Sequence, residues 1–200
     1  MKNAEYIVLF IVLIGASVLM LFSLRSRNKE LVDRNGFLIR SLSVLGTMLF
    51  FDGLILLRFG LGTRSFTGLL LVSVLAFASL SDLLTHTADN CLSVITLIIG
   101  FIGNDVEVVI RRLAAGAVLL TVFIVISVIS GKGLGGADIK IACSCTVVLG
   151  LSRSLLSLMI GMILGVVTMF VLHKLKKYDK KDPFALLPFI SVGALTAYIV

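Results

Sequence analysis

The sequence predicts an all-α protein, built as a polytopic bundle of about eight transmembrane helices. Of the 200 residues, 58% are hydrophobic and only 14% are charged, whereas soluble domains are roughly half apolar and about one-quarter charged. A soluble fold of this length cannot bury so much apolar surface. Apolar runs suited to crossing the hydrocarbon layer also recur along the chain. These observations exclude a soluble enzyme, a nucleic-acid-binding protein and a disordered segment.

Eight apolar segments are expected to cross the membrane. The first is longer than the apolar core of a signal peptide, and no small-residue cleavage site follows it, so we expect it to be retained. The fourth and sixth have 13 residues each, and such short spans need local bilayer thinning or shielding by neighbours. A total of seven spans is the alternative. In chain order the segments are Tyr6–Leu24, Ser41–Leu57, Gly68–Ser81, Cys91–Gly103, Leu113–Ser130, Ile139–Leu151, Ser154–Leu172 and Phe184–Val200.

The basic residues predict how the bundle is oriented in the cell membrane. With eight spans, the lysine- and arginine-rich loops after the first and seventh spans lie on one side, together with the loops that hold Asp82 and Asp138. This side receives 12 of the 18 basic residues. The positive-inside rule makes it cytoplasmic and places both termini outside. Arg111 and Arg112 fall on the opposite side and count against this orientation. The net charge of +7 thus reflects topology and lipid contact, and we expect no nucleic-acid partner.

Three acids lie close to the apolar segments, where a charge is costly. Asp82 ends the third segment and Asp138 precedes the sixth. Two spans separate them, so both carboxyl groups return to the same membrane surface. If they meet, one carboxyl group holds a proton while the other remains a base. Such a pair can activate water against a peptide carbonyl and protonate the leaving amine. The alternative is that both acids merely end helices at the aqueous interface. Asp52 is interpreted as a structural or interfacial acid.

The segments around the two acids resemble the motifs of the type IV prepilin peptidases, which are membrane aspartic proteases. The hexapeptide Gly135–Lys140 resembles the GxGD-x-K signature of this family. Asn90 and Leu92 follow Asp82 at the spacing of the first-aspartate motif. The stretch Pro183–Phe189 is similar to the Pro- and Phe-rich last span of the family. The resemblance covers roughly residues 68–200.

The resemblance implies that Asp82 and Asp138 form a catalytic pair near the cytoplasmic face. The substrate would be a prepilin-like precursor, cut between its short basic leader and its apolar helix. Asn90 and Lys140 would support the two loops, and Gly135 and Gly136 would give the second aspartate a flexible approach. Residues 1–66 would then form two N-terminal transmembrane helices with a basic cytoplasmic loop. Residues 67–200 would form a six-helix catalytic bundle.

The sequence departs from the family pattern in three places. Ala137 replaces the glycine before the second aspartate, and alanine disfavours positive φ. Asp89 replaces the usual proline before Asn90. Both changes put catalytic efficiency in doubt. The loop 25–40 lacks the paired CxxC motifs of the longer members, so we expect no N-methylation of the product. Cys91, Cys143 and Cys145 are interpreted as apolar filling, and we expect no bound metal and no cofactor.

Two functions other than proteolysis are alternatives, a transporter and an assembly factor. A small proton- or ion-coupled transporter would use the two aspartates for ions, but the sequence shows no convincing internal repeat. A catalytically silent pilus or secretion assembly factor would bind pilin-like helices without cutting them. The GxxxG motif Gly161–Gly165 indicates close helix packing, either within the chain or in a homodimer.

Overall fold

The computed structural model describes residues 34–85, 89–130, 135–175 and 185–200. The described residues form helices joined by short turns, with no strand among them. Each expected apolar segment within these ranges corresponds to a helix, and the first, Tyr6–Leu24, lies outside them. The helices are α2 Arg34–Phe59, α3 Thr63–Thr85, α4 Asn90–Ile99, α5 Val106–Ser130, α6 Gly136–Leu149, α7 Leu151–Lys174 and α8 Leu187–Ile199.

Four helices are long and apolar enough to cross a membrane. They contain the segments Ser41–Phe59, Thr63–Thr85, Val106–Ile129 and Leu151–Lys174. The other three, α4, α6 and α8, have 10, 14 and 13 residues. At about 1.5 Å per residue they are shorter than the hydrocarbon layer of about 30 Å. The all-helical architecture is therefore confirmed, whereas the total of about eight spans stays a prediction.

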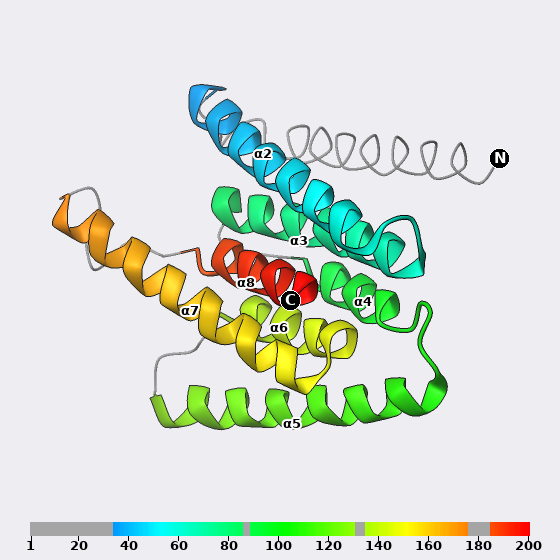
Figure 1. Ribbon diagram of the computed structural model, residues 1–200. Coiled ribbons are helices and arrows are strands. Elements are labelled where there is room, and N and C mark those ends of the chain that lie inside the picture. Colours follow the sequence, from blue (N-terminus) through cyan, green and yellow to red (C-terminus); the bar gives the residue numbers. More distant parts are fainter. Residues whose placement is uncertain (1–33, 86–88, 131–134, 176–184) are drawn as a thin grey trace.

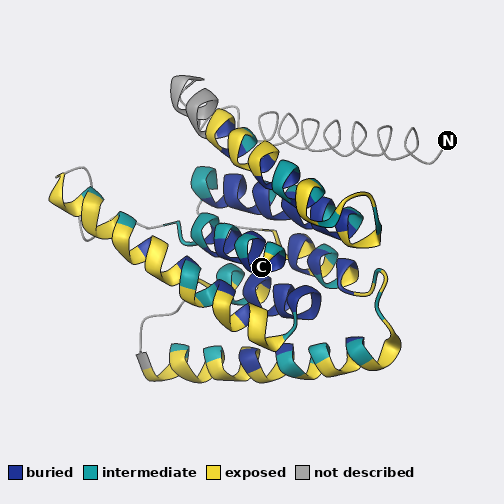
Figure 2. Cartoon of the chain, viewed as in Figure 1, coloured by how far each residue is buried: buried dark blue, intermediate teal, exposed yellow. Residues whose placement is uncertain are grey.

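The short helices α4, α6 and α8 lie between the long helices α2 and α3 on one side and α5 and α7 on the other (Figure 1). α4 and α8 each pack against both α3 and α6, while α5 and α7 pack on the outer sides of α6 and α8. Figure 2 shows α3, α6 and α8 largely buried and α5 and α7 largely exposed. The exposed side chains of α5 and α7 are mostly apolar. This pattern suits helices that face lipid and shield shorter neighbours.

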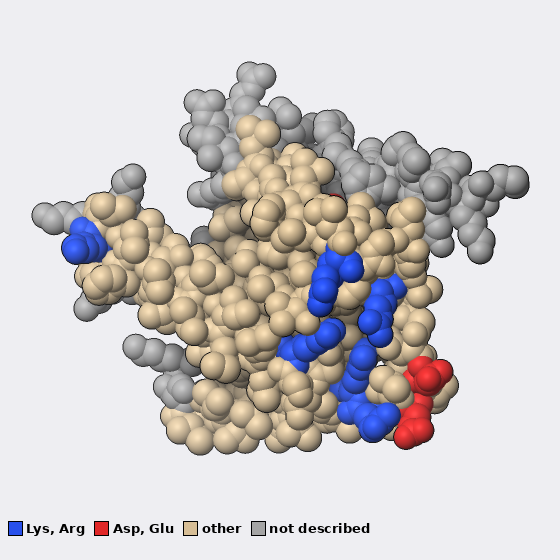
Figure 3. Space-filling model, in the orientation of Figure 1, with Lys and Arg blue, Asp and Glu red and all other residues tan. Residues whose placement is uncertain are grey.

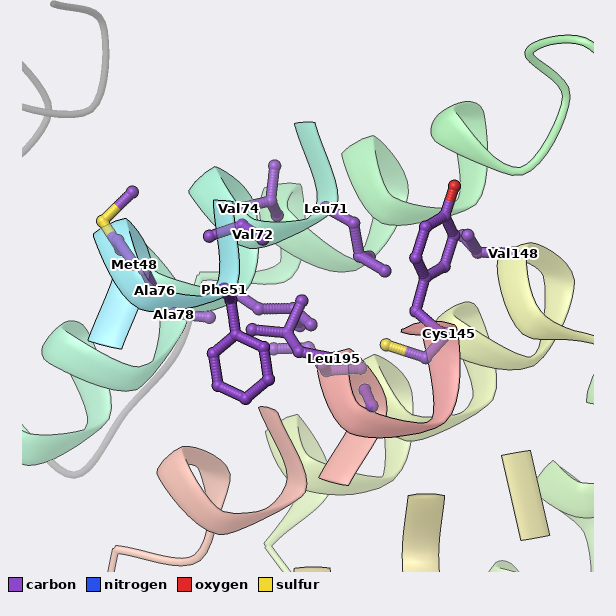
Figure 4. Packing of buried hydrophobic residues seen from close by; sticks show 14 of the residues in the cluster. Met48, Phe51, Leu71, Val72, Val74, Ala76, Ala78, Cys145, Val148 and Leu195 are labelled. Carbon is purple, nitrogen blue, oxygen red and sulfur yellow. The ribbon is translucent and has the colours of Figure 1, made fainter. Parts of the chain in front are cut away.

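The buried core joins helices from both ends of the sequence. Phe51 of α2, Leu75 of α3 and Leu195 of α8 belong to one cluster of buried side chains. Cys145 and Val148 of α6 extend the same cluster toward α7, and several of these residues are seen in Figure 4. The predicted boundary at residue 66 falls within the first turns of α3, and α2 packs against α3 and α8. The division into 1–66 and 67–200 stays a prediction.

α7 and α8 approach closely because both carry glycine where they cross. A Cβ atom on Gly161 would lie 3.0 Å from the Ile190 Cα and from the Phe189 carbonyl oxygen. A Cβ atom on Gly193 would collide with the Ser157 carbonyl oxygen. Gly161 and Gly165 are both buried. The GxxxG motif is thus used for packing within the chain, and a homodimer stays a prediction.

Candidate active site

Asp82 is buried near the end of α3, where the N-terminus of α8 meets it. The side chain is 7% exposed. Its Oδ2 atom accepts a hydrogen bond from the Leu187 backbone N–H at 3.2 Å. Leu187 is the first residue of α8, so this N–H is one of those without an intrahelical acceptor. A backbone donor and the positive end of a helix dipole suit a negatively charged group at this position.

Asp138 lies in the first turn of α6 and is half-buried. Its carboxyl group folds back over Gly135, the residue that precedes the helix. A Cβ atom on Gly135 would lie 2.5 Å from the Asp138 Oδ2 atom. Gly135 therefore leaves the space that the carboxyl group occupies. Gly136 has nothing within 4 Å of its would-be Cβ atom, so packing does not require glycine there.

The two carboxyl groups lie close enough to interact electrostatically. Asp138 is outside the four long apolar segments, and burial is the main reason that its pKa is raised to about 6. The negative charge of Asp82 is the second reason. Two residues far apart in the sequence are thus brought to the same end of the bundle. One carboxyl group of the pair holds its proton more readily than an isolated aspartate does.

The two predicted supporting residues contact each other directly. The Lys140 Nζ atom donates a hydrogen bond to the Asn90 side-chain oxygen at 2.9 Å. Asn90 is the first residue of α4 and Lys140 lies in the second turn of α6. The bond therefore ties the helix after the first aspartate to the helix that carries the second. Both side chains are exposed, so the bond orients the two helix ends more than it stabilises the fold.

The departures from the family pattern are accommodated locally. Ala137 lies in the first turn of α6 and packs against the core. Among the described glycines, positive φ occurs only at Gly60, Gly103 and Gly150. Residue 137 lies within a right-handed helix, so the concern that alanine blocks a positive φ there is not supported. Asp89 has extended backbone angles as the N-cap of α4. Its carbonyl oxygen accepts the Leu92 N–H at 3.0 Å. Neither substitution obstructs the helices that carry the aspartates.

Asp52 fits the structural alternative of its interpretation, whereas one cysteine differs from the expectation. Asp52 is 5% exposed on α2, and its Oδ1 atom has no hydrogen-bond partner among the described residues. It is therefore buried rather than interfacial, because α2 turns this face toward α3 and α8. Cys143 and Cys145 are buried, as apolar filling would be, but Cys91 is exposed. No cluster of His, Cys, Asp or Glu in the described part of the chain has the composition of a metal site.

The role of the α8 N-terminus was missed by sequence reasoning. The sequence indicated that the stretch Pro183–Phe189 is rich in proline and phenylalanine, but no side chain in it can bind a carboxylate. Pro188 in the first turn of α8 is a common signal for a helix start. That signal predicts backbone N–H groups without an intrahelical acceptor at residues 186 and 187, although only the fold shows which acid they meet.

Together the fold and the site define a helical bundle, compatible with a membrane protein, that joins two acidic side chains at one end. Residues 69–170 match the type IV leader peptidase family. The chain belongs to this family, whose members are peptidases. The matched segment includes both aspartates, Asn90 and Lys140. Neither the comparison with curated proteins nor that with solved structures gives a match.

Proposed function

We propose that this protein is an aspartic endopeptidase that removes the short basic leader from type IV prepilin-like precursors at the cytoplasmic membrane face. Asp82 and Asp138 would be the catalytic residues. The observation that carries this proposal is that both carboxyl groups lie at one end of the bundle, near enough for the charge of Asp82 to raise the pKa of Asp138. Membership of a leader peptidase family supports it.

The proposed chemistry divides two roles between two environments. Asp82, which accepts the Leu187 N–H at the start of α8, is suited to take a proton from water. Asp138, whose pKa is raised, is suited to donate its proton to the leaving amine. The water oxygen then bonds to the scissile carbonyl carbon, and the C–N bond breaks as the amine is protonated. No metal or cofactor is required in this scheme.

An apolar cavity next to Asp82 supports a substrate with an apolar helix. The cavity has a volume of about 150 Å³ and lies between α2, α3 and α8. Leu83, the neighbour of Asp82, and Pro188, the neighbour of Leu187, both line it. A precursor helix seated against this surface would present its leader junction to the aspartates. Acidic groups at this end would attract a basic leader.

Replacement of either aspartate tests the proposal. Asp82→Asn and Asp138→Asn keep the side-chain shape but remove the proton transfer. We expect each to lower precursor processing in reconstituted membranes by about a thousandfold or more, the scale seen when an essential catalytic carboxylate is removed. The measurement is the cleaved fraction of a precursor with a basic leader and an apolar helix.

Asp105→Asn is the matched control, because Asp105 is exposed near the opposite end of the bundle. It should process precursor at the wild-type rate, and all three variants should reach wild-type levels in the membrane. Normal processing by either active-site variant would contradict the proposal. Loss of ion flux with normal processing would favour the transporter alternative. The same assay should detect no methylated product, since loop 25–40 lacks cysteine.

A further inference from the structure

Five arginines gather at the end of the bundle opposite the aspartates. Each lies near a helix terminus. Arg58 lies in the last turn of α2, and Arg64 and Arg153 lie in the first turns of α3 and α7. Arg111 and Arg112 lie in the second turn of α5. Asp82 and Asp138 lie at the other ends of α3 and α6. Figure 3 shows most basic side chains of this face gathered at its right end, while a further one lies at the left end.

Three of these arginines line one cavity. Arg64, Arg112 and Arg153 surround a space of about 190 Å³ between α3, α7, α8 and the turn after α4. Thr63, Thr67, Asn104 and Tyr198 add polar groups to its wall, and no acidic residue is among those that line it. The volume is below the range of about 300 Å³ and more that drug-sized ligands occupy. It suits a single polar group.

The cavity wall is held in place by internal hydrogen bonds. Arg112 donates from Nη1 to the Val148 carbonyl at 2.8 Å, and so caps the C-terminal end of α6. The Tyr198 hydroxyl lies 2.6 Å from both the Thr67 hydroxyl and the Arg64 carbonyl oxygen. These bonds join α5 to α6 and α8 to α3 at the cavity wall. A ligand would meet a site whose backbone and polar groups are already ordered.

The positive charge in this cavity is not neutralised within the described chain. All three guanidinium groups act electrostatically on Tyr198, and Arg153 repels Arg112. No described carboxylate lies within ion-pair distance of Arg64, Arg112 or Arg153. The ion pair found at this end joins Glu107 to Arg111 at 3.9 Å. It lies on the exposed surface, and neither residue lines the cavity. Three cations around one space favour an anionic occupant.

We propose that this cavity binds a phosphate group, carried by an anionic phospholipid or present as inorganic phosphate. Guanidinium groups bind phosphate through paired hydrogen bonds, and three of them match a group with several acceptor oxygens better than a single carboxylate. The hydroxyl of Thr63 can add a neutral donor, whereas the Asn104 side-chain nitrogen already donates to the Gly100 and Ile102 carbonyl oxygens. The arginines lie at the ends of α3, α5 and α7, where a lipid headgroup meets a membrane protein.

A pair of double variants tests this site. Arg64→Gln with Arg153→Gln removes two guanidinium groups from the cavity. Arg58→Gln with Arg111→Gln removes the same charge from arginines that do not line it. Arg112 is left unchanged because it caps α6. The measurement is the thermal unfolding of purified full-length protein, titrated with inorganic phosphate at constant ionic strength. A second titration uses phosphatidylglycerol in mixed micelles, with phosphatidylcholine as the neutral lipid.

We expect saturable stabilisation of the wild type by phosphate, by phosphatidylglycerol or by both, since a ligand that binds only the folded state raises Tm. The cavity double variant should bind about tenfold or more weakly, as expected for the loss of charged hydrogen bonds. The surface double variant should match the wild type. Stabilisation by phosphatidylglycerol alone assigns the site to lipid, and stabilisation by phosphate alone assigns it to the free anion. No saturable effect, or equal weakening in both double variants, would overturn the proposal.

Discussion

Asp82 and Asp138 receive their different properties from the helix ends around them. Asp82 is buried and accepts an N–H from α8, whereas Asp138 sits over Gly135 and is half-buried. The sequence could predict that both acids reach the same membrane surface, because two predicted spans separate them and two crossings return the chain to its original side. It could not predict that α8 supplies the partner of Asp82, since that contact joins residues 105 positions apart.

The raised pKa of Asp138 predicts how stability depends on pH. Its pKa rises from an ordinary 3.8 to about 6 in the folded protein. Between these values the folded state binds more protons than the unfolded state, so this group lowers stability as pH rises from about 4 to 6. Asp138→Asn removes this loss. We therefore expect the Tm of Asp138→Asn minus that of the wild type to increase across this window and to level off above it.

The same experiment tests whether Asp82 acts on Asp138. Asp82→Asn removes one of the two causes of the raised pKa, so the stability loss due to Asp138 should move to lower pH. Thermal unfolding of Asp82→Asn, with and without Asp138→Asn, measures this shift between pH 4 and pH 7. Asp105→Asn should leave the curve unchanged. An identical pH midpoint with and without the Asp82 carboxylate would show that the two side chains do not interact.

At the scale of helices, hydropathy could predict where most helices lie in the sequence. It could not predict which of them are buried by neighbouring helices. The segments Cys91–Gly103 and Ile139–Leu151 were expected as spans, and they correspond to α4 and α6. Their short length is explained by neighbours that cover them, which is a property of packing and not of either segment. The helix α6 begins at Gly136, with Gly135 as its N-cap, three residues before the apolar segment begins. An acid in the first turn favours a helix start at that point.

Close packing of α7 on α8 predicts a large effect from one methyl group. In Gly193→Ala the new Cβ atom meets the Ser157 carbonyl oxygen and lies 2.9 Å from the Gly161 nitrogen. Both are backbone atoms of α7 and cannot rotate away, so the helices must separate. We expect the free energy of unfolding to fall by about 1–3 kcal/mol, the range for overpacked cores, measured by denaturant titration in detergent.

Gly46→Ala on α2 is the control for this change. Nothing lies within 4 Å of its would-be Cβ atom, and alanine is the better helix former, so stability should stay equal or rise by up to about 1 kcal/mol. Equal stability of Gly193→Ala and the wild type would show that α7 and α8 are not in contact at this crossing.

At the scale of the whole molecule, the two ends of the bundle carry functional groups of opposite charge. The acids Asp82 and Asp138 mark one end, and the arginine-lined cavity marks the other. Composition could predict a membrane bundle because apolar content is a property of the entire chain. The cavity could not be predicted, because its arginines come from α3, α5 and α7. They lie far apart in the sequence, and no motif links them. The concentration of arginine at one end also weakens any orientation inferred from the described residues alone.

The orientation of the bundle is therefore the last prediction to be tested. If the chain crosses the membrane eight times as predicted, 12 of the 18 basic residues fall on the side of the aspartates. The positive-inside rule then predicts that the aspartates face the cytoplasm and the arginine-lined cavity faces outside. Lys174→Cys marks the first side and Glu107→Cys the second, and both positions are exposed. Each is made in a Cys91→Ser background, because Cys143 and Cys145 are buried. An impermeant maleimide should label Glu107→Cys in intact cells and Lys174→Cys only after permeabilisation. The reverse pattern would place the proposed active site outside and exclude cleavage at the cytoplasmic face.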